Sequence, residues 1–529
     1  MTLLLSLALG LAASSAADCA GISAAPSAVR VEYDSRTSAV GRMSALIFAP
    51  SSGGELQAID ADSGSVLWRF VPPEVLATTA PSDRMTDVAV LRFDANGDGV
   101  IDAAGGDRVW LYFGLKRAGA AYYALDVTRR TPRVLWSADA STLEGLVDAW
   151  STPTVARVRV AGATQNGEHF VIVVGGGFSR ETSGAGNHLF MLDAASGRRL
   201  WSAGPESGSD RALAGMTFGI AARIAALDID GDGFADRLYT ADVGGRVWRF
   251  DIWNGRERGA LVTGGVFASL GSADALAASP AAPPAAPGQP PPSPDARRFF
   301  TAPDVALMQP RGQNPWYNLA IGSGDVDNGG ATTVRNRFYS LRDRNPFVKR
   351  AQAYYDAAPP LLDADLTPVT AGASGVPEDS PGWKLDLGAR EQVLAEPVTA
   401  NGVVMFTTHE PGGSVDGSLC GSNDTNRVYA LRIESAAAAL DLNGDLLLTE
   451  ADRSAVLEQK GIAAGVRIET PVPQQGAPTA PSSGTPEQPG LPGGPAAAAP
   501  NCLVGAELLA HCVPLDTVLR TFWKRTSVN

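Results

Sequence analysis

The stretch LFMLDAASGRRLW, residues 189–201, decides the fold, because two earlier stretches repeat its plan. LQAIDADSGSVLW (56–68) and YYALDVTRRTPRVLW (122–136) also have an alternating apolar segment, an aspartate turn and a second segment that ends on tryptophan. The closing tryptophans are 68 and 65 residues apart. Repeats of this kind are typical of propeller blades, because one blade cannot bury both of its faces alone. We expect each tryptophan to pack between neighbouring blades.

Less regular copies of the repeat bring the number of recognisable blades to six; they begin at residues 237, 316 and 403. We expect a seventh blade to be closed by both chain ends, with GVRIET (465–470) and RTFWKR (520–525) pairing with an early strand such as VRVEYD (29–34). The prediction is an all-β, modified seven-bladed β-propeller over residues 44–440. A pair of packed sheets is the competing architecture, and the periodicity disfavours it.

The N-terminal residues 1–17 are apolar and end in small residues, which predicts a signal peptide cleaved before Asp18, followed by a lead-in over 18–43. No Lys or Arg precedes the apolar run. A misplaced start, a chain that is the C-terminal part of something longer, or a buried apolar element are therefore alternatives. No other stretch has the length and hydrophobicity of a membrane span.

Two segments, 277–296 and 471–500, are so rich in Pro, Ala and Gly that we expect extended loops. The second lies in a C-terminal region, 461–529, which we expect to close the propeller and to fold without that loop. The chain has four cysteines. Of these, Cys502 and Cys512 are the favoured disulfide pair; sequence alone leaves the pairing of Cys19 and Cys420 open.

DIDGDGFAD, residues 228–236, concentrates aspartates in a short loop before two predicted strands. Like charges this close disfavour a compact turn unless a cation lies between them. Oxygens at positions 1, 3, 5, 7 and 9, with glycine at position 6, are the pattern that calcium prefers. We therefore predict a calcium site, with a solvated acidic turn as the alternative. Its ligands would be Asp228, Asp230, Asp232, the Phe234 carbonyl and Asp236.

Two further acidic loops are candidate metal sites, of which the first repeats this spacing. DANGDGVID (94–102) predicts a weaker calcium site, or a turn of the same shape; its ligands would be Asp94, Asn96, Asp98, the Val100 carbonyl and Asp102. DLNGDLLLTEAD (441–452) follows an EF-hand register but has Leu446 where the turn prefers glycine. It predicts either a weakened metal loop or the start of a helix over 449–461 that Thr449 would cap, within a region 441–460 of loop and helix. The candidate ligands there are Asp441, Asn443, Asp445, the Leu447 carbonyl, Thr449 and Asp452.

Charge and missing motifs exclude several functions. The 529 residues carry 43 Lys and Arg against 56 Asp and Glu, a net charge of −13, which disfavours nucleic acid and anionic lipid as partners. The sequence contains no CxxC, HExxH, GxSxG or phosphate-binding GK[ST] motif. GGGF (175–178) follows an apolar segment but precedes no helical pattern, so we expect a tight strand connection. No catalytic residue is predicted.

Taken in order, several phrases resemble the C-terminal propeller of the PilY family of type IV pilus biogenesis factors and tip adhesins. They are AAYYALDVT (120–128), STPTVARVRV (151–160), FVIVVGGGF (170–178), LFMLDAASG (189–197), IAALDIDGDGFADRLYTADVGGRVWRFDI (224–252), RFYSLRD (337–343), GWKLDL (382–387) and AEPVTANGVVMFTTHEP (395–411). The resemblance covers nearly all of residues 44–440. It implies a seven-bladed propeller that binds calcium through Asp228, Asp230, Asp232 and Asp236.

The resemblance also implies a function in pilus assembly, in opposing pilus retraction and thus in twitching motility, and in adhesion to host or abiotic surfaces. Minor pilins of the pilus tip complex would be the partners. The location would be the periplasm, the outer membrane, the pilus tip or the cell surface. The repeats also resemble quinoprotein propellers, so a pyrroloquinoline quinone dehydrogenase is an alternative, although the adjacent cysteines of those enzymes are missing here. A generic outer-membrane assembly scaffold is another alternative.

Overall fold

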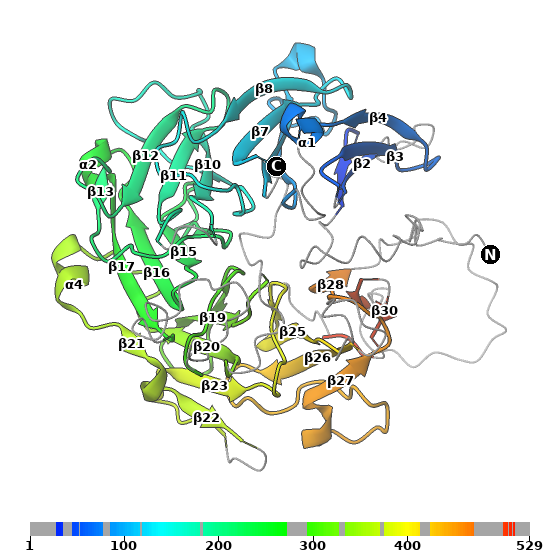
Figure 1. Cartoon of the computed structure of the whole chain (residues 1–529), viewed down its shortest axis with the longest axis vertical. Helices are drawn as coiled ribbons and strands as arrows, with labels where there is room; N and C mark the ends of the chain where they lie inside the picture. The colour runs from blue at the N-terminus through cyan, green and yellow to red at the C-terminus, as the bar shows by residue number, and fades with distance from the viewer. Residues whose placement is uncertain are drawn as a thin grey trace, which may run out of the picture.

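The chain folds into seven antiparallel-based β-sheets that follow one another around a ring, as the repeats predicted (Figure 1). We call these sheets blades 1 to 7 in chain order. The computed structural model describes residues 28–34, 45–51, 53–77, 85–116, 119–179, 184–271, 294–326, 334–370, 375–412, 424–469, 501–505, 507–509 and 511–513. The architecture is an all-β propeller.

The first three blades use strands in chain order. Blade 1 contains β1 (Val29–Glu32), β2 (Ala45–Pro50), β3 (Leu56–Asp60) and β4 (Val66–Phe70). Blade 2 contains β5 (Ala89–Phe93), β6 (Arg108–Leu115), β7 (Ala121–Asp126) and β8 (Arg133–Ala138). Blade 3 contains β9 (Thr154–Arg157), β10 (Phe170–Gly175), β11 (Leu189–Asp193), β12 (Arg199–Gly204) and β13 (Arg211–Ala212). The helix α1 (Pro73–Ala77) and the 3-10 turn η2 (Ala103–Gly105) connect strands here.

A segment between two strands of blade 5, called the excursion below, contributes an edge strand to blade 4. Blade 4 contains β14 (Ala225–Leu227), β15 (Arg237–Ala241), β16 (Arg246–Ile252), β17 (Val262–Ser269) and, on its outer edge, β21 (Leu361–Leu362). Blade 5 contains β18 (Asp304–Met308), β19 (Trp316–Gly322), β20 (Arg337–Asp343), β22 (Thr367–Val369) and β23 (Gly382–Asp386). Residues between β20 and β23 therefore leave blade 5, add a strand to blade 4 and return.

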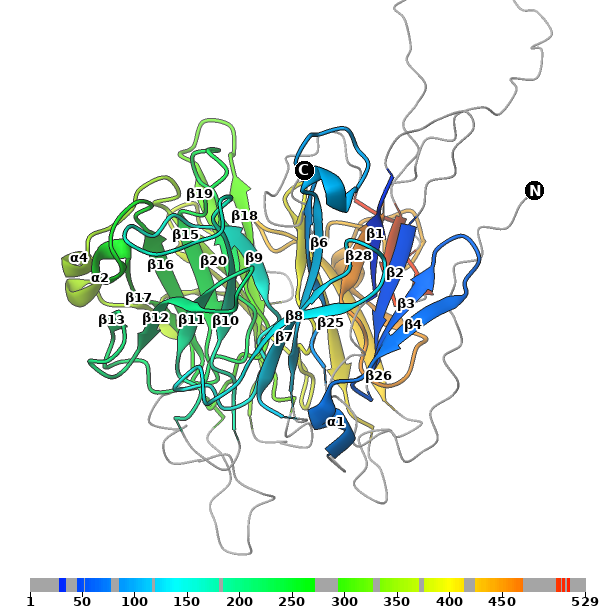
Figure 2. The same cartoon turned by 90° about the horizontal axis from the view of Figure 1, so that it is seen from above.

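Short helices lie at the outer rim of blade 4. Both α2 (Arg258–Leu261) and α4 (Gln352–Ala357) lie beside β17 there (Figure 2). The 3-10 turn η3 (Asp363–Asp365) follows β21. The excursion that carries α4 thus covers the outer face of a blade to which it does not belong in sequence.

The last two blades end the ring. Blade 6 contains β24 (Val398–Ala400), β25 (Val403–Glu410), β26 (Thr425–Arg432) and β27 (Ser454–Leu457), with the 3-10 turn η4 (Glu450–Arg453) before β27. Blade 7 contains β28 (Val466–Glu469), β29 (Asn501–Val504) and β30 (Glu507–Leu508). The sheets thus extend on both sides of the predicted range 44–440.

The repeat phrases form equivalent hairpins. In each, the register shifts at the same point, after Ala58, Ala124 and Met191, which face the closing tryptophans Trp68, Trp136 and Trp201. The aspartate ends the first strand because its carboxylate accepts backbone N–H bonds from the turn; Asp193 accepts from Ala195 and Ser196. The repeated Asp and Trp therefore encode one bulged hairpin three times.

The tryptophans pack between blades, as predicted. Trp68 of blade 1 donates its indole N–H to the Arg130 carbonyl of blade 2 at 2.7 Å. Trp136 of blade 2 donates to the Ala194 carbonyl of blade 3 at 3.0 Å. Trp201 is fully buried in the cluster between blades 3 and 4. Trp136 and Trp201 thus bury their rings and Trp68 is partly buried, and two of the three also satisfy a backbone oxygen of the next blade.

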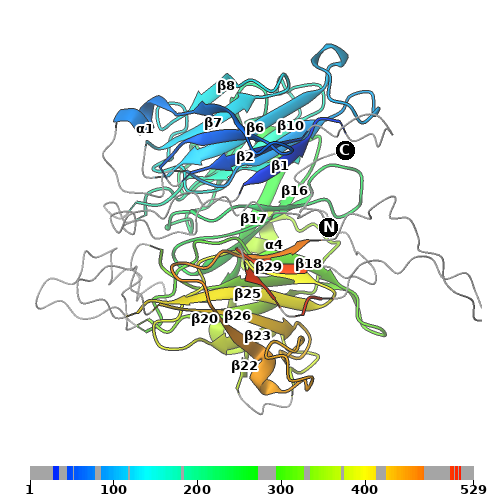
Figure 3. The ribbon, with the colours of Figure 1, turned by 90° about the vertical axis from the view of Figure 1, so that its right-hand side faces the viewer.

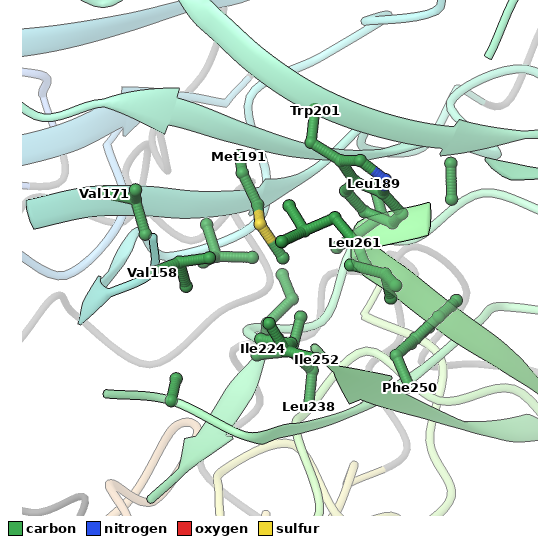
Figure 4. Packing of buried hydrophobic residues seen from close by; sticks show 14 of the residues in the cluster. Val158, Val171, Leu189, Met191, Trp201, Ile224, Leu238, Phe250, Ile252 and Leu261 are labelled. Carbon is green, nitrogen blue, oxygen red and sulfur yellow. The ribbon is translucent and has the colours of Figure 1, made fainter. Parts of the chain in front are cut away.

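Most of the core lies in apolar clusters between two consecutive blades. Figure 4 shows the cluster between blades 3 and 4, in which Met191 and Trp201 from one sheet pack near Leu238 and Ile252 from the other and Leu261 from α2. Comparable clusters join the other consecutive pairs from blade 1 to blade 7. Burying each such side chain contributes about 1.5–3 kcal/mol relative to exposure. Adjacent blades therefore stabilise one another.

The predicted closure by pairing of both chain ends is wrong for the strands that the structure describes. β28 pairs with β29, not with the VRVEYD segment, and that segment forms β1, which pairs with β2. Figure 3 shows the blue strands of blade 1 and the orange and red strands of blade 7 as separate groups. Both segments found closer partners within their own blades, which costs less loop-closure entropy than pairing ends of a long chain. RTFWKR lies outside the described residues.

The helix predicted over 449–461 is also wrong. Only η4 forms, and residues 454–457 become the edge strand β27, whose Leu457 is buried opposite Asn426 of β26. A helix this short gains little by itself, whereas the strand adds ladder hydrogen bonds to an existing sheet. The predicted cap does form, since the Thr449 hydroxyl accepts the N–H of Ala451 at 3.3 Å.

The structure tests several other predictions from the sequence. A disulfide joins Cys502 and Cys512, as predicted (S–S 2.06 Å). The GGGF segment forms a tight connection after β10, where a Cβ on Gly177 would meet the Asp148 carbonyl oxygen at 1.6 Å. None of the helices in the described ranges has the length and hydrophobicity to cross a membrane. Residues 1–17, Cys19, Cys420, 471–500 and most of 277–296 lie outside those ranges.

Candidate metal centre

The loop 228–236 connects β14 to β15 in the inner hairpin of blade 4. The Asp228 carboxylate folds it by accepting the backbone N–H groups of Gly231 and Gly233, both at 2.7 Å. These glycines have φ of 83° and 86°, a left-handed conformation in which a side chain would be strained. Asp230 and Asp232 each accept the N–H group two residues onward. The loop is therefore held in its turn by carboxylate oxygens that accept its own backbone N–H groups.

The three acidic loops have the same backbone hydrogen bonds. In each, the carboxylate at position 1 accepts the N–H groups of positions 4 and 6, at 2.7–2.8 Å. The side-chain oxygens at positions 3 and 5 then accept the N–H groups of positions 5 and 7. One local sequence pattern therefore produces one turn three times, in blades 2, 4 and 6.

Carboxylate oxygens gather in two of these loops. Among the described residues, groups of three acids with ligand atoms within 4.8 Å of one another occur at Asp228, Asp230 and Asp236, and at Asp441, Asp445 and Asp452. Burial raises the pKa of the Asp228 carboxyl, and the nearby Asp236 and Asp232 carboxylates raise it further. Such crowding is relieved when a cation binds.

Asp236 is the buried end of the first loop. Its side chain is 3% exposed. One oxygen, Oδ2, accepts the N–H group of Ile229 at 3.0 Å. The other, Oδ1, accepts a hydrogen bond from the ammonium group of Lys349, which belongs to the excursion from blade 5. Asp236 therefore ties the loop both to itself and to the neighbouring blade.

Phe234 ties the same loop to blade 3. Its ring lies between two guanidinium groups, with the Cζ atoms of Arg157 and Arg159 each 4.5 Å from the ring centroid. The N–H group of Ala235 donates to the Arg157 carbonyl at 2.8 Å. Cation–π contacts of this type are worth about 0.5–2 kcal/mol each. The loop therefore contacts three consecutive blades.

The second loop, 94–102, differs at its end. Asp102 caps η2, where its Oδ1 accepts the Ala104 N–H at 2.9 Å. The buried Asp107 instead accepts the N–H groups of Ala95 (2.8 Å) and Asp102 (2.7 Å). Asp107 thus takes the place that Asp236 has in the first loop. The acidic pattern did not predict Asp107, because Asp107 lies five residues after Asp102, the last position of the pattern. Its place directly before an apolar strand was a signal that could have indicated it.

The third loop, 441–452, projects from blade 6. Leu446 adopts φ of 67°, where the other loops have glycine, and its side chain is 84% exposed. Asp452 closes the loop and accepts the N–H of Thr449 at 2.8 Å. The side chain of Leu447 at position 7 is also exposed. His511 Nε2 lies 3.8 Å from Asp441. Among the described residues, the acids of this loop have neither the cation–π contacts nor the lysine partner of the first loop.

A buried charge network lies behind the first loop. Arg237, directly after Asp236, is fully buried and donates to Asp251 at 2.8 Å. Arg249 bridges Asp251 and Asp343. Burial alone would raise the pKa of Asp251, but Arg237 and Arg249 hold it below its usual value. This network joins blades 4 and 5 and supports the strand that leaves the loop.

The donor set of the first loop fits calcium. Its oxygens are carboxylates and a backbone carbonyl, the hard ligands that calcium prefers, and three of the acids already lie close together. Asp228, Asp230, Asp236 and the Phe234 carbonyl would hold the ion, together with Asp232, whose carboxylate lies near enough to raise the pKa of Asp228. Sequence reasoning predicted these residues but not Lys349, because the lysine lies more than a hundred residues away and belongs to no recognisable motif.

The chain is similar to proteins of the PilY family, which confirms the resemblance predicted from its motifs. It is 25% identical over 418 residues to the type IV pilus biogenesis factor PilY1 homolog of Xylella fastidiosa, over 74% of this chain and 26% of the relative. To PilY1 of Pseudomonas aeruginosa it is 27% identical over 215 residues, 39% of this chain and 17% of the relative. The chain thus spans about a quarter or less of the length of these curated relatives.

The fold is shared with a solved structure. The crystal structure of the Pseudomonas aeruginosa PilY1 C-terminal domain matches with a TM-score of 0.58 at 17% identity, over 88% of this chain and 92% of that chain. Residues 52–282 also match the family described as outer membrane protein assembly factor BamB. The similarity to PilY1 thus covers most of the propeller, and the BamB match covers its first half.

Proposed function

We propose that this chain acts in type IV pilus biogenesis as a calcium-binding propeller that is exported to the cell surface. The observation that carries the proposal is the similarity to PilY1 proteins over 74% of the chain, together with the PilY1-like fold. The protein would reside in the periplasm, at the outer membrane or at the pilus tip. Minor pilins would be its partners, and pilus extension and retraction, twitching motility and surface adhesion would depend on it.

Calcium would stabilise the contacts between neighbouring blades of the propeller. The loop 228–236 contacts blades 3, 4 and 5 through Phe234, its own strands and Asp236. An ion bound there would fix the inner hairpin of blade 4 against both neighbours. Binding to the folded state alone adds about 2.7 kcal/mol when calcium is a hundredfold above its dissociation constant.

A deletion strain tests the pilus function. We expect loss of surface pili and of twitching, restored by the wild-type gene and restored poorly by Asp232→Ala at equal protein level. Asp98→Ala, in the second loop, is the matched control and should restore motility more fully. Normal piliation and twitching in the deletion strain, with no redundant homologue, would contradict the proposal.

The similarity to the BamB family over residues 52–282 favours a second candidate function, an outer-membrane assembly scaffold. The two candidates differ in the deletion phenotype. A scaffold predicts reduced amounts of many outer-membrane proteins, whereas a pilus factor predicts loss of pili with those amounts unchanged. Neither function requires catalysis, and we expect none from this chain.

A further inference from the structure

Lys349 is the cation that neutralises the buried end of the first acidic loop. Its ammonium group donates to Oδ1 of Asp236, while Oδ2 of the same carboxylate accepts the Ile229 N–H at 3.0 Å. Each oxygen of Asp236 therefore already accepts one hydrogen bond. The side chains are 22% and 3% exposed, so this pair lies at the boundary between solvent and the interior. A carboxylate this buried is unstable without a positive partner.

The backbone around Lys349 is held by the buried arginines of blade 4. The carbonyl of Val348 accepts hydrogen bonds from Arg237 and Arg249, both at 2.6 Å. On the other side, the N–H group of Arg350 donates to Asp251 at 2.8 Å. Because its two neighbours are fixed, Lys349 can leave Asp236 only by moving its side chain.

We propose that Lys349 is an internal competitor of calcium at the loop 228–236 and sets the calcium affinity of that loop. This inference rests on the proposed calcium binding. An ion that takes Oδ1 of Asp236 must displace the ammonium group, because two cations on one oxygen repel each other. The partial exposure of Lys349 gives its side chain a path to solvent. The lysine thus stabilises the calcium-free loop and weakens binding.

Calorimetric calcium titration tests the affinity. All proteins in this test carry Asp98→Ala and Asp445→Ala, which change the other two acidic loops and leave the first loop intact. In this background, the protein that keeps Lys349, called wild type here, is compared with Lys349→Met. We expect Lys349→Met to bind at least tenfold more tightly and to melt at a lower temperature without calcium. Lys384→Met is the matched control, because Lys384 also pairs with an aspartate, Asp363 at 2.6 Å, far from the loop in sequence. Its affinity should equal that of wild type.

A second measurement needs no variant. Amine-reactive labelling read by mass spectrometry should modify Lys349 at least threefold faster in saturating calcium than in chelator, with Lys384 unchanged. Equal affinity of wild type and Lys349→Met, or unchanged labelling of Lys349 with calcium bound, would overturn the competition while leaving calcium binding intact. Absence of binding by every protein would overturn both. Binding by Lys349→Met alone would support the competition but contradict calcium binding by the wild-type loop.

Discussion

The loops 228–236 and 441–452 have the same backbone but different surroundings. In both, the first aspartate accepts the same two N–H groups and three acids converge within 4.8 Å. In the first, Phe234 lies between two arginines, and Lys349 pairs with the buried acid. In the third, Leu446 and Leu447 point into solvent.

The comparison of the two loops separates two properties, the shape of the turn and its contacts with neighbouring blades. The spacing of acids determines the turn, because those hydrogen bonds are local. Whether the turn can connect blades depends on residues elsewhere in the chain, such as Arg157 and Lys349. We therefore expect perturbations of the first loop and its supports to cost far more than matched perturbations of the third.

The largest difference should come from the arginines behind the loops. Arg237→Met should destabilise the protein by about 3–5 kcal/mol, because it leaves buried carboxylates and backbone carbonyls without their partner. Arg453→Met, beside the third loop, removes a partly exposed pair with Glu450 at 3.4 Å and should cost less than about 1 kcal/mol. Urea unfolding of both variants measures the difference. Equal losses would mean that the network does not distinguish the two regions.

Calcium should distinguish the loops next. Asp232→Ala should abolish a calcium-dependent stabilisation of about 2.7 kcal/mol at a hundredfold excess over the dissociation constant. Asp445→Ala should remove a smaller increment, because Leu446 strains the third loop. Asp94→Ala should also do less than Asp232→Ala, because Asn96 lowers the charge of the second loop. Melting temperatures with and without calcium check this. The same calcium shift in wild type and Asp232→Ala would identify the first loop as an acidic turn only.

The smallest effect should come from exchanging the residues at position 6. Gly233→Leu should destabilise by about 1–2 kcal/mol, since it forces a side chain into the left-handed region, and its Cβ would approach Arg157 Nη1 to 3.3 Å. Leu446→Gly should stabilise by up to about 1 kcal/mol, because relief of the same strain exceeds the added freedom of the unfolded chain. Chemical denaturation of the pair measures both signs. Destabilisation by Leu446→Gly would show that Leu446 makes a contact worth more than its strain.

The sequence by itself determined the features that depend on neighbouring residues. The repeated Asp and Trp predicted the hairpins, and thus a propeller, because turn hydrogen bonds and alternation act within about fifteen residues. The acidic spacing predicted turns of one shape at 94–102 and 228–236. The threonine at 449 predicted its cap, and the nearest cysteines predicted their disulfide.

Only the tertiary structure decided which partners those local units found. It turned residues 454–457 into an edge strand, paired β28 with β29 and brought Asp107 into the place expected for Asp102. It also carried Lys349 from blade 5 to Asp236 in blade 4. Such contacts join residues far apart in the chain, and their free energy depends on how whole sheets pack. No local pattern records them, because the same turn is equally stable by itself with or without a lysine beside it.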